Sequence, residues 1–179
     1  RKFCSFVVSN AKGAPERERF FQLLSEYKQV DSGGRYKNNV GGPVPDKTAF
    51  IKDYKFNIAF ENSMCDGYTT EKIMEPMLVN SVPIYWGNKL IDRDFNPASF
   101  INVSSYSSLE EAVEHIVRLD QNVPQNDLQG VVLAGGVVQD NIEPAIPMGH
   151  RGEQGERAQR GHQERHGDFE HLLNFRSAV

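Results

Sequence analysis

The chain has 179 residues and a formal net charge of −4, with 39% hydrophobic and 25% charged residues. These values are typical of a soluble globular protein with one core, and the acidic balance argues against a nucleic-acid partner, which requires a basic face. Cys4 and Cys65 are too few for a disulfide framework and have no metal-ligand spacing. We therefore expect both cysteines to be free thiols.

The first third of the chain predicts a strand, a helix and a loop. Apolar and β-branched residues over 2–9 predict a buried strand. Pro15 suits the first turn of a helix, whose apolar stripe continues to about Lys28. A very short strand at 29–31 precedes a loop at 32–45 that contains four glycines and two prolines.

The middle of the chain predicts two strands joined through a helix. Asp46 is a good N-cap for a short helix, and residues 54–60 form the next strongly apolar strand. Thr70 opens a further helix, and residues 82–86 complete a βαβ unit. The polar loop at 61–72 then lies at the carboxyl end of a strand, where open α/β sheets bind their ligands.

One more strand and helix follow. Residues 100–103 predict a strand, and the Ser107–Glu111 segment is a capping box that begins a helix with an apolar face of Ala112, Ile116 and Leu119. Together the segments up to residue 122 predict an α/β fold with a doubly wound, mostly parallel sheet.

Residues 123–179 have a different character. They contain no lysine and two aromatic residues, whereas residues 1–122 contain nine lysines and sixteen aromatics. We expect a disordered tail, because residues 149–167 have almost no apolar side chains to offset the entropy of ordering. A solvated linker and an altered reading frame both explain the change. The tail also contains four histidines, His150, His162, His166 and His171. No cysteine or carboxylate pattern completes a metal site with them, so we predict none.

Two cations are placed to meet an anion. Arg17 and Lys72 each lie in the first turn of a helix that follows a strand, where helix N–H groups already favour a phosphate. An enzyme that breaks a sugar–phosphate bond must stabilise the negative charge that builds on the leaving group. The alternative for Arg17 is a solvated helix face. Thr69 or Thr70 is otherwise the helix cap, and Glu71 a favourable charge at the N-terminus of the helix.

Other polar residues near this loop have open assignments. Glu61 ends an apolar strand and requires an explanation, while Asn62 either shapes the turn or faces a ligand. Tyr68 either packs on the helix or contacts a nucleotide. Tyr54 is a core or strand-edge residue, with base contact as the second possibility.

Several motifs in order resemble the C-terminal donor-binding domain of the α-1,3-fucosyltransferases of glycosyltransferase family 10, and most closely its bacterial members. They are FVVSN at 6–10 with Arg17 after it, FNIAFENS at 56–63, GYTTEKI at 67–73 and VPIYWG at 82–87. The resemblance covers about residues 2–122. It implies the Rossmann-like donor half of a GT-B glycosyltransferase, with the acceptor half absent from this chain.

The resemblance also implies roles for individual residues. Arg17 and Lys72 would stabilise the leaving GDP as catalytic residues, with the general base in the acceptor half. Residues implied to bind substrate are Ser9, Asn10, Tyr54, Asn62, Tyr68, Thr70 and Glu71. No metal or other cofactor is predicted beyond GDP-fucose as the donor substrate.

The family reaction inverts the anomeric carbon and transfers fucose from GDP-fucose to a glycan hydroxyl, typically on N-acetylglucosamine. The resemblance implies a glycan acceptor and peripheral membrane association of the full enzyme. The location would be the cytoplasm at the inner membrane face in a bacterium, or the Golgi in a eukaryote.

The chain begins with Arg1 and has no membrane-spanning apolar run, so we expect that an upstream part is missing and that this fragment alone is inactive. The alternatives are a noncatalytic α/β binding module and the donor half of another GT-B glycosyltransferase.

Overall fold

A computed structural model describes residues 1–122, which form a five-stranded sheet in the order β2-β1-β3-β4-β5. Every pairing in this sheet is parallel. The strands are β1 (Lys2–Phe6), β2 (Val30–Ser32), β3 (Tyr54–Phe60), β4 (Val82–Trp86) and β5 (Ile101–Asn102). The expected α/β fold with a doubly wound parallel sheet is confirmed.

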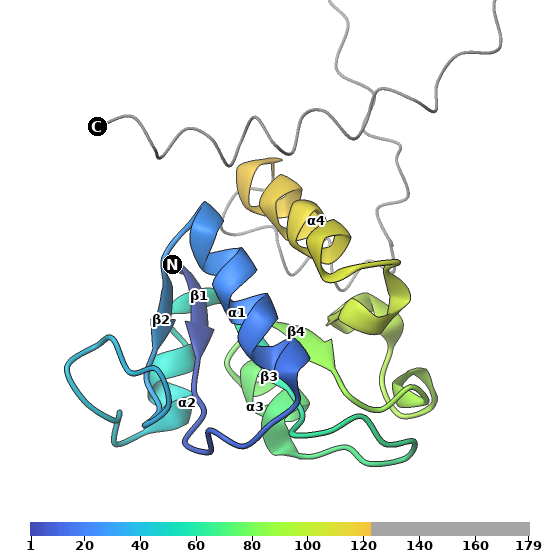
Figure 1. Cartoon of the computed structure of the whole chain (residues 1–179), viewed down its shortest axis with the longest axis horizontal. Coiled ribbons are helices and arrows are strands. Elements are labelled where there is room, and N and C mark those ends of the chain that lie inside the picture. Colours follow the sequence, from blue (N-terminus) through green and yellow to red (C-terminus); the bar gives the residue numbers. More distant parts are fainter. Residues whose placement is uncertain (123–179) are drawn as a thin grey trace, which may run out of the picture. The chain divides into compact units, whose positions relative to one another are not determined.

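Helices connect the strands and cover both faces of the sheet. They are α1 (Pro15–Tyr27), α2 (Lys47–Ile51), α3 (Glu71–Leu78) and α4 (Leu109–Asn122), with 3-10 turns at Ile91–Arg93, Pro97–Ser99 and Val103–Ser105. Figure 1 shows α1 crossing the strands with α4 beside it. α2 and α3 contact each other and are joined by an ion pair between Lys47 and Glu75.

The hydrophobic core has a layer on each side of the sheet. Phe20 of α1 and Ile116 of α4 pack with the strand residue Phe60 in the larger cluster. Ile73 of α3 packs with Tyr85 of β4 in the smaller one. All of these side chains are buried, so the two layers hold the helices against the sheet.

Most predicted elements are found, with differences at some strand ends. β1 ends at Phe6 rather than Ser9, because the Val8 carbonyl accepts a hydrogen bond from Tyr36 N at 3.0 Å, in the loop that follows β2. β5 contains two residues where the sequence predicts the strand 100–103. Asp46 caps α2 as expected, accepting a hydrogen bond from Ala49 N at 2.9 Å.

Three further predictions concern the cysteines, membrane-spanning segments and residues 123–179. Cys4 is buried and Cys65 is exposed, and both are free thiols, as expected. Over the described part of the chain, no helix is long and apolar enough to cross a membrane. The predictions for residues 123–179, including disorder, reading frame and the four histidines, lie outside the described residues.

Candidate functional site

The candidate site lies where the strand order reverses. β1 and β3 are neighbours in the sheet although β2 lies between them in the chain, and open α/β sheets bind ligands outside the carboxyl ends of the strands at such a point. The loops that leave these two strands meet there, since Ala14 N donates to Asn62 O at 2.8 Å. The β1–α1 and β3–α3 loops therefore form one unit.

Arg17 ties these loops together through its guanidinium. It donates to Asn62 Oδ1 at 2.8 Å and to the Asn10 carbonyl oxygen at 2.7 Å, and 2% of its surface is exposed. A Cβ on Gly13 would lie 2.3 Å from Arg17 Cζ, so a larger residue there would displace the guanidinium from this position. Burial lowers the pKa of Arg17, but an arginine starts from so high a value that it remains a cation.

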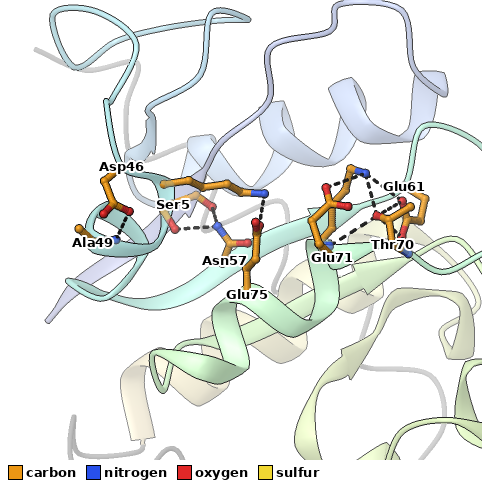
Figure 2. Close-up of polar contacts among 10 residues, drawn as sticks. Ser5, Asp46, Ala49, Asn57, Glu61, Thr70, Glu71 and Glu75 are labelled. Atoms are coloured by element: carbon orange, nitrogen blue, oxygen red, sulfur yellow. Dashed lines mark hydrogen bonds and ion pairs between the residues drawn. The ribbon is translucent and has the colours of Figure 1, made fainter.

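Lys72 is held at the start of α3 by a buried carboxylate. Its Nζ lies 3.1 Å from Glu61 Oε2 and 2.9 Å from Thr70 Oγ1. Glu61 also accepts hydrogen bonds from Thr70 N at 2.8 Å and from the Thr70 hydroxyl, and none of its surface is exposed. Figure 2 shows Glu61, Thr70 and Glu71 gathered at this end of the helix.

Residues that follow β4 contact Glu61 and the β3–α3 loop. A Cβ on Gly87 would lie 2.5 Å from Glu61 Cγ, so the glycine makes room for the buried carboxylate. Asn88 is 1% exposed, accepts a hydrogen bond from Gly67 N at 2.7 Å and donates to Thr69 Oγ1 at 3.0 Å. Sequence reasoning missed Asn88, although its place directly after the VPIYWG motif was the available signal.

The structure brings most of the predicted site residues to this edge. Ser9 and Asn10 are exposed on the β1–α1 loop, and Tyr68 is 45% exposed on the β3–α3 loop. Glu71 is exposed beside Lys72, with its Oε1 3.8 Å from Lys72 Nζ. These side chains are accessible to a ligand at the carboxyl ends of β1 and β3.

Thr70 has a different role from the predicted substrate contact. Its hydroxyl is the N-cap of α3 and also bonds to Glu61 and Lys72, so its hydrogen-bonding capacity is used within the protein. This arrangement supports the capping alternative, and we reassign Thr70 from substrate binding to the support of Lys72.

The structure places Tyr54 away from the candidate site. Tyr54 is the first residue of β3 and therefore lies at the amino edge of the sheet, opposite the candidate site. Its side chain is 1% exposed, and its hydroxyl donates to Asp31 Oδ2 at 2.8 Å. The core or strand-edge alternative applies to this residue.

A cavity with a volume of about 480 Å³ lies near the carboxyl ends of β4 and β5. Its lining includes Met64, Trp86, Asn102 and Tyr106, but not Arg17 or Lys72. Although both cations are predicted to meet an anion, neither lines this cavity. They are linked instead through the consecutive residues Glu61 and Asn62. Within residues 1–122 no group of three or more His, Cys, Asp or Glu side chains is placed to hold a metal ion.

Comparison with known proteins decides the family. The family model of the glycosyltransferase family 10 (fucosyltransferase) C-terminal domain matches residues 1–126. The chain belongs to glycosyltransferase family 10. The predicted resemblance is thereby confirmed.

Relatives and solved structures agree with this assignment. The chain is 42% identical over 116 residues to the α-(1,3)-fucosyltransferase FucT of Helicobacter pylori, an alignment that covers 65% of this chain and 24% of the relative. It is 34% identical over 129 residues to human GDP-fucose protein O-fucosyltransferase 3, covering 65% of this chain and 27% of that protein. A crystal structure of an α1,3-fucosyltransferase with GDP-fucose superposes with a TM-score of 0.69 at 39% identity, covering 74% of this chain and 38% of that one. The chain therefore spans about a quarter of the length of these curated relatives.

Proposed function

We propose that this chain is the donor-binding half of an inverting α-1,3-fucosyltransferase and that it binds GDP-fucose. The observation that carries the proposal is the anchoring of two cations from different helices on consecutive residues at the end of β3, Lys72 on Glu61 and Arg17 on Asn62. A solved fucosyltransferase structure that contains GDP-fucose has the same fold and 39% identity, which supports the same donor here.

The chemistry of the donor requires such cations. When the bond between fucose and the diphosphate breaks, negative charge develops on the leaving GDP, and preorganised donors that meet this charge lower the barrier. Lys72 has three N–H donors, of which Glu61 and Thr70 take two, so one is left for a phosphate oxygen. Arg17 uses two of its five N–H donors on Asn62 and Asn10, and we assign the others to the diphosphate.

We assign the remaining contacts to hydroxyl recognition. Ser9 and Asn10 lie on the β1–α1 loop, where they would approach the nucleotide. Asn62 and Tyr68 are exposed on the β3–α3 loop, and Glu71 is exposed at the first position of α3. Their amide, phenol and carboxylate groups suit the hydroxyls of ribose and fucose. No step of this assignment uses a metal ion.

The acceptor half and the general base are assigned to a part of the enzyme outside this chain. An inverting transfer needs a base that removes the acceptor proton, and alignment of both substrates provides much of the rate. We therefore propose a glycan hydroxyl as acceptor for the full enzyme and little catalysis by this chain alone. With relatives in a bacterium and in vertebrates, we propose the cytoplasmic membrane face or the Golgi, respectively, as the location of the full enzyme.

Titration calorimetry with GDP tests the donor site. We expect the 179-residue chain to bind GDP in preference to UDP, and Lys72→Ala to weaken GDP binding roughly tenfold through loss of a charge-assisted hydrogen bond. Lys52→Ala is the matched control, because Lys52 is exposed at the opposite edge of the sheet, two residues before β3. Absence of GDP binding to the unaltered chain rules out the proposed function, and preference for UDP indicates another GT-B family.

A further inference from the structure

The side chain of Glu61 lies beneath the start of α3, in the position where a helix N-terminus holds an anion. Thr70 N donates to Oε1 at 2.8 Å, and a Cβ on Gly87 would overlap the Glu61 side chain, so no space remains behind the carboxylate. An internal carboxylate thus already accepts from the backbone N–H of Thr70, the N-cap residue of α3. We expect a donor phosphate to be met here mainly by the Lys72 ammonium.

The same carboxylate determines where that ammonium lies. Glu61 Oε2 accepts from Lys72 Nζ at 3.1 Å, and the Thr70 hydroxyl, which donates to Glu61, accepts from the same Nζ at 2.9 Å. A lysine side chain has many rotamers, and two fixed acceptors restrict them to one region. The third N–H of Lys72 is therefore directed before any ligand arrives, and the side chain keeps 18% of its surface exposed.

We propose that Glu61 is the positioning residue of the donor site, which acts through Lys72 and has no contact of its own with the diphosphate. This inference rests on the proposed function, because it assumes that Lys72 meets GDP. It goes beyond that function because it assigns a favourable role to Glu61, a carboxylate whose charge alone would weaken the binding of an anionic ligand. A negative charge beside the site repels a diphosphate, so its benefit has to come from geometry.

Glu61→Gln separates geometry from charge. The substitution removes one negative charge and keeps the size of the side chain, so charge alone predicts tighter GDP binding. Positioning predicts the opposite: GDP binding becomes roughly tenfold weaker, because the single amide oxygen of glutamine cannot accept from both Thr70 N and Lys72 Nζ as the two carboxylate oxygens do. Guanosine, which has no phosphate, should bind both proteins equally. The matched control is Glu114→Gln on α4, the same charge change on an exposed side chain that pairs with Arg118.

A double-mutant cycle tests whether Glu61 acts through Lys72. In a Lys72→Ala background, Glu61→Gln should cause no further loss of GDP affinity. An equal loss in both backgrounds, unchanged or tighter GDP binding by Glu61→Gln, or a parallel loss of guanosine binding would each overturn the proposal. Failure of the unaltered chain to bind GDP would instead overturn the proposed function.

Thr70→Val provides a second variant if Glu61→Gln does not fold. It removes the hydroxyl that bridges Glu61 and Lys72 but leaves both charges in place. We expect weaker GDP binding with unchanged guanosine binding, measured by the same calorimetry. Unchanged GDP affinity in a folded Thr70→Val chain contradicts the positioning role.

Discussion

Lys72 holds its ammonium 3.1 Å from Oε2 of Glu61, and the next residue, Asn62, accepts a hydrogen bond from Arg17 at 2.8 Å. The two cations come from α1 and α3, helices that pack against opposite faces of the sheet. Both helices begin at the carboxyl edge, because each follows a parallel strand. The doubly wound topology therefore brings side chains 55 positions apart to one pair of consecutive residues.

Arg17→Lys should lower both stability and GDP affinity. One ammonium cannot make the two directed bonds of the guanidinium to Asn62 and Asn10, and the polar groups left behind are partly buried. We expect the free energy of unfolding to fall by about 2 kcal/mol. Urea unfolding followed by calorimetry with GDP measures both effects.

The control for this substitution is Arg19→Lys, two residues further along α1. Arg19 is exposed and pairs with Glu110 at the surface, an interaction that a lysine can also make. This variant should behave like the unaltered chain in both measurements. If Arg17→Lys behaves in the same way, the buried guanidinium does not connect the two loops.

Tyr54→Phe should affect stability without affecting the donor site. The phenol donates a hydrogen bond to Asp31 at the amino edge of the sheet, and Gln29 Nε2 also lies 2.7 Å from Asp31. Loss of a hydrogen bond to a carboxylate should cost about 2 kcal/mol in thermal or urea unfolding. GDP affinity should remain unchanged, and a clear loss of affinity would support the predicted role of Tyr54 in substrate binding.

The sequence predicts the elements of this fold well because their signals are local. Hydrophobic periodicity identifies β3, β4 and α4, and the caps Asp46 and Thr70 are found where the pattern predicts them. The end of β1 is not predicted, because it depends on hydrogen bonds from a loop almost thirty residues later in the chain. The first residue of a parallel strand lies at the amino edge, and the predicted substrate contact of Tyr54 does not take this direction into account.

The candidate site is predicted only in part for a related reason. A sequence shows that Glu61 and Lys72 lie near strand and helix ends, but the pairing of their charges depends on side-chain directions at the meeting of three elements. The same applies to Asn88, whose amide holds the Gly67–Thr69 turn from the end of another strand. Residue types and strand ends therefore predict the location of the site, and the structure adds the internal contacts.

Asp120 should make the chain sensitive to acid. Burial alone would raise the pKa of this carboxyl, but hydrogen bonds from Lys55 and Lys28 outweigh burial and lower it. A carboxyl with a lowered pKa in the folded state stabilises the fold above its unfolded pKa of about 3.9, and this contribution is lost as the pH falls through the lower folded value. Stability should therefore decrease below about pH 4.

Asp120→Asn isolates this contribution. At pH 7 the variant should lose about 3 kcal/mol of unfolding free energy, because Lys55 is 9% exposed and would be left without its carboxylate. The difference between the variant and the unaltered chain should shrink as the pH is lowered toward 3, in urea unfolding at a series of pH values. Glu114→Gln is the control, and a difference that stays constant with pH contradicts the assignment.

Thiol labelling reports on the loop that contains the candidate site. Cys65 is exposed in the β3–α3 loop, whereas Cys4 is buried in β1, where burial raises the pKa of its thiol well above the usual range. A thiol reagent at pH 8 should therefore modify Cys65 rapidly and Cys4 only after unfolding in urea, because the thiolate is the reactive form. Saturating GDP should slow the modification of Cys65, since the loop also contains Asn62 and Tyr68.

A Cys65→Ser chain, which should lack the fast phase, is the control. An unchanged rate at a GDP concentration that calorimetry shows to be saturating would mean that the ligand binds away from this loop.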